Sequence, residues 1–231
     1  MGNLMKKYGF ATSAFAIGVA LVATAFIGLR AQAAIYDGLS DDEKNQVQAG
    51  SQVVKTVDVA GASWPKVTVY QYVKATPEEV MGVFTDYERA TSYMGGLTKA
   101  KISKRIDART VEIDYLLALP LVADEWYTVR DTLSDYDNGH AYQVAWSLVK
   151  AYSTRSSEGA MKVEAMGSGS IISYYNFVVS NRAGAGFLYK KAIARVKDSV
   201  RDIQREVERV KDKDPAYLST RVKALSEALG H

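Results

Sequence analysis

Three acidic side chains are the groups in this sequence best placed for acid–base chemistry. Asp114, Glu125 and Asp131 fall in segments rich in β-branched and aromatic residues, where a strand can bury one of its faces. A buried carboxyl group works as a general acid or base once its surroundings bring its pKa toward neutrality. The spacing of the three residues does not require such a role. We therefore name no catalytic residue and keep an enzyme as an alternative.

Other reactive groups are scarce. The sequence has no cysteine and two histidines, His140 and His231, which argues against a cysteine nucleophile, a Ser-His-Asp triad and a His/Cys metal cluster. His140 follows the predicted turn Asn138-Gly139 and is expected to be exposed. Gly167-Ser168-Gly169 is not followed by a lysine-bearing helix, which argues against a phosphate loop. We predict neither a metal nor a cofactor.

The first 33 residues have the pattern of a bacterial secretory signal peptide. Lys6 and Lys7 precede an uncharged apolar run over residues 8–29, and Ala31-Gln32-Ala33 has the small-x-small form of a cleavage site. We expect export to the periplasm or out of the cell, with cleavage after Ala33. The apolar run is longer than is usual for such segments, so an uncleaved membrane anchor is the alternative.

Removal of this segment leaves a chain without net charge. The sequence has 29 basic and 26 acidic residues, and residues 1–33 hold three of the basic ones and no acidic one, which leaves 26 of each sign. A neutral chain lacks the electrostatic footprint of a nucleic-acid-binding protein, so we expect no nucleic acid as a partner. The 48% hydrophobic content excludes a disordered chain, and a single long apolar run excludes a polytopic membrane protein.

The first part of the mature chain is expected to contain both helices and strands. Two capping boxes are expected, Ser40 with Glu43 and Thr76 with Glu79, and Pro77 takes the first helical position after Thr76. The expected elements are a helix over residues 39–49, strands over residues 51–60 and 66–74, a helix that starts at Thr76, and a second short helix over residues 86–94.

Residues 97–180 predict an antiparallel meander. Runs of β-branched and aromatic residues alternate with short polar turns, of which Asn138-Gly139 is the strongest hairpin signal. Such short links connect antiparallel neighbours. The expected strands cover residues 97–105, 110–119, 122–134, 141–151, 160–166 and 169–180.

A long amphipathic helix is predicted over residues 186–211. Its apolar residues recur at steps of four and three and form one narrow stripe, while Arg201, Arg205 and Arg209 alternate with acidic residues on the other side. We expect the stripe to face the sheet and the charged side to face solvent. A coiled-coil dimer along the stripe is the alternative. A short tail helix is expected over residues 216–229.

One helix cannot cover the sheet that these strands form. A helix is about 10 Å across, and six or seven expected strands are much wider. The sheet must therefore curl around the helix, and an apolar cavity is expected where helix and sheet diverge. The two short helices after residue 76 would close one end. Ligand sites are usually apolar concavities of this kind.

The order of elements and one motif resemble the START-like, helix-grip superfamily. Lys74-Ala75-Thr76-Pro77-Glu78-Glu79-Val80, followed by Val83-Phe84-Thr85-Asp86-Tyr87-Glu88-Arg89, is similar to the opening signature of these domains. Leu119-Pro120-Leu121 resembles the hairpin between two central strands. The resemblance implies an α+β fold in which a curved antiparallel sheet wraps around a long C-terminal helix. The expected organisation is a signal peptide over residues 1–33, a helical lead-in over residues 34–50, the START-like domain over residues 51–211 and a tail helix within residues 212–231.

The superfamily includes lipid-transfer domains, coenzyme Q-binding proteins and polyketide cyclases. The resemblance therefore implies an exported protein that binds or transports a hydrophobic ligand, such as a lipid, sterol or quinone, with transient membrane contact. One alternative is a cyclase- or hydratase-like enzyme that uses a cavity carboxylate. Another is a structural module that docks a partner through the arginine side of the long helix or through the tail helix.

Strand alternation supplies candidates for the cavity wall. Residues 110–119 and 141–151 each present one clear apolar stripe, whereas residues 122–134 place a charge on either face and the face of residues 169–180 stays open. We expect the charge on residues 122–134 to belong to a structural ion pair, with a functional role as the alternative. The predicted ligand-binding residues are Val111, Ile113, Tyr115, Leu117, Tyr142, Val144, Trp146, Leu148, Tyr174 and Phe187.

Overall fold

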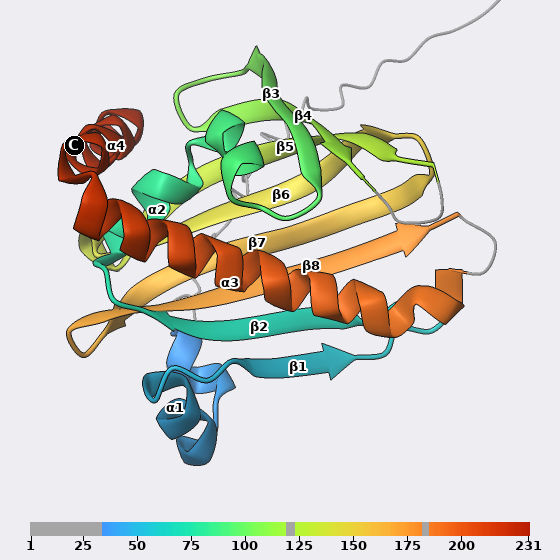
Figure 1. The fold of residues 1–231 in the computed structure, drawn as a ribbon, viewed down its shortest axis with the longest axis horizontal. Coiled ribbons are helices and arrows are strands. Elements are labelled where there is room, and N and C mark those ends of the chain that lie inside the picture. The colour runs from blue at the N-terminus through green and yellow to red at the C-terminus, as the bar shows by residue number, and fades with distance from the viewer. Residues whose placement is uncertain (1–33, 119–122, 182–184) are drawn as a thin grey trace, which may run out of the picture. The chain divides into compact units, whose positions relative to one another are not determined.

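A computed structural model describes residues 34–118, 123–181 and 185–231, which are built on one antiparallel sheet (Figure 1). Eight strands are hydrogen-bonded in the order β1-β2-β8-β7-β6-β5-β4-β3. The predicted signal segment, the predicted 119–121 hairpin and Gly184 lie outside the described residues. The strands are β1 (Val53–Val57), β2 (Lys66–Val73), β3 (Leu97–Arg105), β4 (Thr110–Leu117), β5 (Glu125–Tyr136), β6 (Ala141–Ala151), β7 (Thr154–Met166) and β8 (Gly169–Ser180).

Helices precede, interrupt and follow the strands. The second short helix expected over residues 86–94 is the 3-10 helix η2, which spans Tyr87–Ser92. The long helix starts at Tyr189, with one 3-10 turn before it. The helical elements are η1 (Ile35–Gly38), α1 (Asp41–Gln48), α2 (Pro77–Phe84), η2 (Tyr87–Ser92), η3 (Asp137–Gly139), η4 (Ala185–Leu188), α3 (Tyr189–Lys213) and α4 (Pro215–Leu229).

Both predicted capping boxes are present. The Ser40 side chain accepts from the backbone N–H of Glu43 while the Glu43 carboxylate accepts from the backbone N–H of Ser40. Thr76 and Glu79 make the same reciprocal pair at the start of α2. Each box satisfies backbone donors that have no partner within the helix.

The meander matches the prediction most closely where turn chemistry is strong. Strands β3, β6 and β8 have the predicted bounds. Strand β7 starts six residues earlier than expected, at Thr154, because its polar first half continues the ladder with β8, where Thr154 pairs with Ser180. The sheet has eight strands, which correspond to the two expected before residue 76 and the six expected after it.

Between β2 and β3 the chain passes from near one edge of the sheet to the opposite edge. Helices α2 and η2 make this crossing, and the meander then returns strand by strand until β8 pairs with β2, with Tyr70 opposite Ser173. Strands β1 and β3 are thereby left at the two edges.

Helix α3 lies across one face of the sheet, which we call the inner face (Figure 1). Its stripe residues Val200, Ile203, Val207 and Val210 are fully buried. They pack with residues of α2, α4 and the sheet in the main hydrophobic cluster. The apolar stripe of α3 is therefore covered by other residues of the same chain.

The tail helix α4 belongs to the same core. Leu218, Leu225 and Leu229 are buried in the main cluster. Helices α2 and α4 approach closely at Gly82, where an added Cβ would lie 3.1 Å from the carbonyl carbon of Arg221. Glycine at this position permits the close contact.

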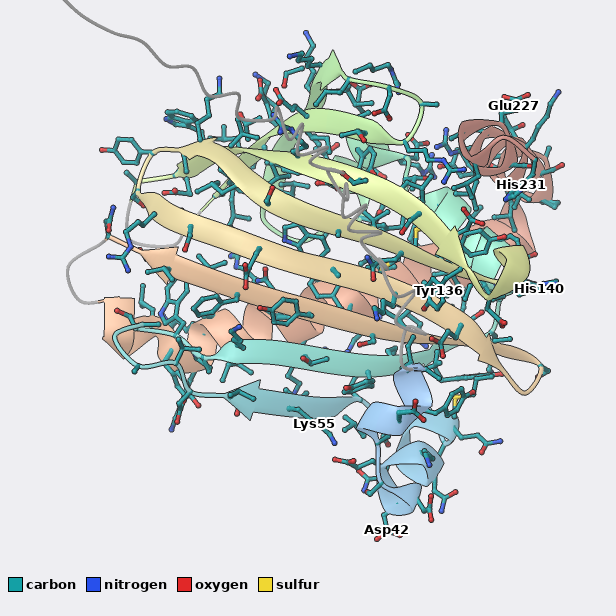
Figure 2. The ribbon with its side chains drawn as sticks, turned by 180° about the vertical axis from the view of Figure 1, so that it is seen from behind. Asp42, Lys55, Tyr136, His140, Glu227 and His231 are labelled. Carbon is teal, nitrogen blue, oxygen red and sulfur yellow. The ribbon has the colours of Figure 1, made fainter. Side chains whose placement is uncertain are left out.

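A smaller cluster holds the lead-in against the other side of the sheet. Ile35, Leu39 and Val47 from η1 and α1 are buried beside Tyr70 and Ile171 of strands β2 and β8. Figure 2 looks onto this outer face and shows Tyr136 on it, with α1 and η1 along the side where β1 lies.

The described residues hold neither a membrane-spanning helix nor a metal-binding cluster. No helix among them is both long and apolar enough to cross a bilayer. They also contain no group of three or more His, Cys, Asp or Glu residues arranged to hold a metal ion.

Candidate ligand-binding site

A cavity of about 700 Å³ lies between α3 and the inner face of the sheet. This volume falls in the range usual for small-molecule sites. Its helical side is lined by Leu188 of η4 and by residues of α3 between Lys191 and Asp202. The aromatic and large aliphatic residues of its wall are Trp64, Val67, Phe84, Met94, Leu97, Tyr115, Leu117, Tyr127, Val129, Trp146, Leu148, Tyr174, Val178, Leu188, Ile193 and Val196.

Half of the predicted binding residues lie on this wall. Tyr115 and Leu117 reach it from β4, Trp146 and Leu148 from β6, and Tyr174 from β8. Whether they bind a ligand stays a prediction. Their alternation along each strand is the pattern from which they were chosen.

The structure places four other predicted residues away from the cavity. Val111 and Ile113 pack beneath Tyr87 of η2 in a separate small cluster. Tyr142 and Val144 belong to the main core, where α2, α3 and α4 fill the space. Their side chains point to the inner face as predicted, but at these positions along the strands helices pack on the sheet and leave no cavity.

The remaining predicted residue is Phe187. Its backbone lies in η4, and its side chain is outside the described part of the chain.

Aromatic rings form the centre of the wall. The Trp146 and Tyr174 ring centroids are 5.1 Å apart, and those of Tyr115 and Tyr127 are 5.4 Å apart. Trp146 pairs with Gly159 on β7, and a Cβ added there would lie 2.2 Å from Cζ2 of the indole. Glycine at this position lets the indole lie flat against the sheet.

Hydroxyl groups of buried tyrosines add polar points to this apolar wall. Burial raises the pKa of Tyr115, Tyr127 and Tyr174. These side chains therefore stay protonated at neutral pH, and each can donate one hydrogen bond.

Asp131 is one of two buried acidic residues on the cavity wall, and Glu125 is the other. The inward face of β5 carries Glu125, Tyr127, Val129, Asp131 and Leu133, which settles the face that the sequence left open. Asp131 is 4% exposed, and its Oδ1 has no hydrogen-bond partner among the residues that the structure describes. Burial raises its pKa to about 8.

The expected structural ion pair is wrong for Asp131. No lysine, arginine or histidine of the described residues lies within 4.0 Å of its carboxyl group. Removal from water without a cation nearby favours the neutral acid. At neutral pH the Asp131 carboxyl group is therefore largely protonated and can both donate and accept a hydrogen bond.

The other two candidate acids have structural partners. Glu125 is buried, and its carboxylate accepts hydrogen bonds from the backbone and hydroxyl groups of Ser153 and Thr154, which fixes the turn from β6 to β7. Asp114 lies on the outer face and accepts from the Thr128 hydroxyl at 2.6 Å, which lowers its pKa. Neither has the unsatisfied oxygen that marks Asp131.

Arg195 is a cavity residue that the sequence did not indicate. It lies on α3, and its Nη1 is buried and finds no hydrogen-bond partner in the described part of the chain. Arginines on the flank of an amphipathic helix usually extend into solvent, so only the three-dimensional structure identifies this one. Asn176 and Trp64 also line the cavity and were missed, because the face of β8 was left open and Trp64 precedes the strand.

No family model and no curated protein sequence matches the chain. Solved structures do match it. A STAR-related lipid transfer protein from Xanthomonas axonopodis has a TM-score of 0.61 at 12% identity, over 68% of this chain and 93% of that one. Human STARD10 has a TM-score of 0.62 at 13% identity, over 73% and 74%. Human StAR-related lipid transfer protein 5 has a TM-score of 0.59 at 11% identity, over 70% and 84%.

These similarities define the class of fold. An antiparallel sheet curled around a long C-terminal helix, with two short helices between its second and third strands, is the START-like helix-grip fold. The motif from Lys74 to Arg89 directly follows β2 and forms α2 and the start of η2 in it. The fold predicted from the sequence is confirmed.

Proposed function

We propose that this protein binds and carries a hydrophobic ligand, such as a lipid, sterol or quinone, in the cavity between α3 and the sheet. The observation that carries the proposal is the cavity of about 700 Å³ with its aromatic and aliphatic wall. Each 100 Å² of apolar ligand surface buried there contributes about 2.5 kcal/mol. The names of the similar human and Xanthomonas proteins describe lipid transfer, which supports the same kind of ligand.

The polar groups on the wall would orient such a ligand. Oδ1 of Asp131 and Nη1 of Arg195 each lack a partner. A buried polar group without a partner costs free energy, which a ligand with one polar end would recover. A wholly apolar molecule would leave both groups unsatisfied.

Native mass spectrometry of protein purified from its own host tests ligand binding. We expect a co-purified apolar molecule that is lost in Leu148→Trp, because the larger side chain fills part of the cavity. Val149→Trp is the matched control, because the neighbouring Val149 is exposed. Absence of bound ligand in the unmodified protein, together with no lipid binding on titration, would refute the proposal.

A second candidate function is an enzyme of the cyclase or hydratase kind. The protonated Asp131 in an apolar cavity supports it, because a carboxyl group with a pKa of about 8 can act as an acid or a base near neutral pH. Asp131→Asn separates the two functions. A carrier still binds its ligand in this variant, with a weaker hold on the polar end, whereas an enzyme loses turnover of its aromatic or polyketide substrate.

We further propose that the protein is exported and cleaved after Ala33. The basic start, the apolar run and Ala31-Gln32-Ala33 support this proposal. Fractionation of the host and N-terminal sequencing of the mature protein test it. A membrane-bound chain that retains residue 1 would favour the anchor instead.

Transient membrane contact is part of the same proposal. Trp126 and Tyr152 are 44% and 62% exposed and adjacent, since the backbone N–H of Tyr152 donates to the Trp126 carbonyl. Ser153, the next residue, lines the cavity. Exposed Trp and Tyr side chains are suited to a bilayer interface. Loss of vesicle binding in the Trp126→Ser variant would support this contact, and unchanged binding would contradict it.

A further inference from the structure

A buried carboxylate on the outer face of the sheet has no cation beside it among the described residues. Glu164, on β7, is 9% exposed. Its Oε1 accepts a hydrogen bond from the Tyr136 hydroxyl at 2.9 Å, and its Oε2 accepts one from the backbone N–H of Ile35 at 2.9 Å. No described lysine, arginine or histidine lies within 4.0 Å of it. Buried carboxylates are rarely left without a charged partner.

The hydrogen bond from Ile35 brings the preceding residue close to this carboxylate. Ile35 is 5% exposed in the cluster beneath η1, and the Tyr36 hydroxyl donates to the Ala165 carbonyl, so the segment is held at two points. Three covalent bonds separate the backbone nitrogens of Ala34 and Ile35, so the Ala34 nitrogen lies within about 7 Å of the Glu164 oxygen.

We propose that Glu164 is the binding site for the new α-amino group that cleavage between Ala33 and Ala34 creates. In the uncleaved chain the Ala34 nitrogen is a neutral amide. Hydrolysis of that bond consumes one water and leaves a carboxylate on Ala33 and an amine on Ala34, which is mostly protonated at pH 7. Free rotation about the Ala34 backbone then lets the ammonium approach Glu164 and complete an ion pair.

The inference rests on the export part of the proposed function and gives processing a structural consequence. Removal of residues 1–33 supplies the cation that the Glu164 site lacks, so the processed chain holds its lead-in more tightly. Lys162 is the nearby alternative cation. It lies two residues away on β7, but its Nζ is placed over the Tyr136 ring, 5.9 Å from the ring centroid.

The experiment varies the amine and the carboxylate independently. The full chain is produced with a recognition site for a sequence-specific protease directly before Ala34, and cleavage then leaves Ala34 as the first residue. A second version carries three inserted residues between that site and Ala34, which moves the ammonium away. Each version is made with Glu164, with Glu164→Gln, and with the control Lys162→Gln.

We expect the chain that starts at Ala34 to unfold about 2–4 °C higher than the extended one. The difference should persist in Lys162→Gln and vanish in Glu164→Gln. An equal difference with and without the Glu164 carboxylate, or no difference at all, overturns the inference.

A second readout needs no substitution at Glu164. The rate at which an amine-reactive reagent labels the α-amino group should be lower for the chain that starts at Ala34 than for the extended chain, and equal rates count against the ion pair. N-terminal sequencing of the natural protein separates the two proposals. Cleavage at another bond overturns both the cleavage assignment and this inference. Cleavage after Ala33 without the Glu164 effect overturns the inference alone.

Discussion

At the scale of single residues, Asp131 couples the stability of the fold to pH. Its pKa is about 8 in the folded protein, because burial disfavours the charged form, and about 3.9 in an unfolded chain. A raised pKa means that the folded state binds the proton more tightly. The stabilising effect of that proton is fully present below pH 4 and is lost as the pH rises through 8.

Asp131→Asn should therefore be more stable than the unmodified protein at high pH. The advantage should grow between pH 4.5 and pH 8.5, to an upper bound of roughly 5 kcal/mol at about 1.36 kcal/mol per pH unit. Urea unfolding at several pH values measures it. Asp114→Asn is the control with the opposite sign, because the hydrogen bond from Thr128 lowers the pKa of Asp114. If the difference in free energy of unfolding between Asp131→Asn and the unmodified protein does not vary with pH, the raised pKa is contradicted.

Gly159→Ala tests the packing of the cavity wall. The added methyl group would lie 2.2 Å from the Trp146 indole and 2.4 Å from the Tyr175 carbonyl oxygen, so both the ring and the strand backbone must shift. We expect a changed near-ultraviolet circular dichroism spectrum and less bound ligand in native mass spectra. Gly186→Ala is the control, since nothing lies within 4 Å of a Cβ added there. An unchanged ligand load in Gly159→Ala would show that Trp146 does not limit the space.

At the scale of elements, α3 is held to η2 by a buried acid on its charged side. Glu206 is 6% exposed and accepts from Arg209 at 2.7 Å and from Arg89 at 2.9 Å. The hydrogen bond from Arg209, followed by that from Arg89, lowers the pKa of Glu206 despite its burial. The prediction that this side of the helix is solvated therefore holds for Arg205, which is exposed, and fails for Glu206.

Glu206→Gln should destabilise the protein by about 1–3 kcal/mol at pH 7, because the four hydrogen bonds from Arg89 and Arg209 lose their charged acceptor. A lowered pKa means that the stabilisation is present above about pH 4.3 and is lost as the pH falls below it. The difference between variant and unmodified protein should therefore shrink in acid, as measured by urea unfolding at pH 7 and pH 3.5. The exposed Glu227, 66% accessible in its pair with Lys223, supplies the control Glu227→Gln, which should change stability by less than about 0.5 kcal/mol. Equal effects of the two substitutions would argue against a special role for Glu206.

At the scale of the whole molecule, periodicity and turn chemistry predicted most of the fold. Strands such as β6 could be placed because one face is apolar and a turn with Asn138-Gly139 precedes it. The apolar stripe of α3 was predicted to face the sheet, because the sheet needs an apolar cover. The polar first half of β7 could not be predicted, because its pairing with β8 comes from the ladder rather than from its own side chains.

The binding site was less predictable than the fold. Alternation identifies an inward side chain, but it does not say whether a helix lies above it, so Val144 and Trp146 looked equivalent in the sequence. The face of β5 stayed open because both choices bury a charge, and the cost of burying Asp131 shows only in the folded structure. Arg195 reaches the cavity from a helix position that sequence patterns assign to solvent.

The pairing of β2 with β8 also determines when this chain can finish folding. Val73 ends β2 and its partner strand begins at Gly169, so synthesis must proceed by roughly a hundred further residues before the middle of the sheet can close. Until then the chain emerging from the ribosome has an incomplete sheet with an open edge. Under the export proposed above, the chain would stay threadable through a translocation channel for most of its synthesis, because its strand order delays closure of the sheet.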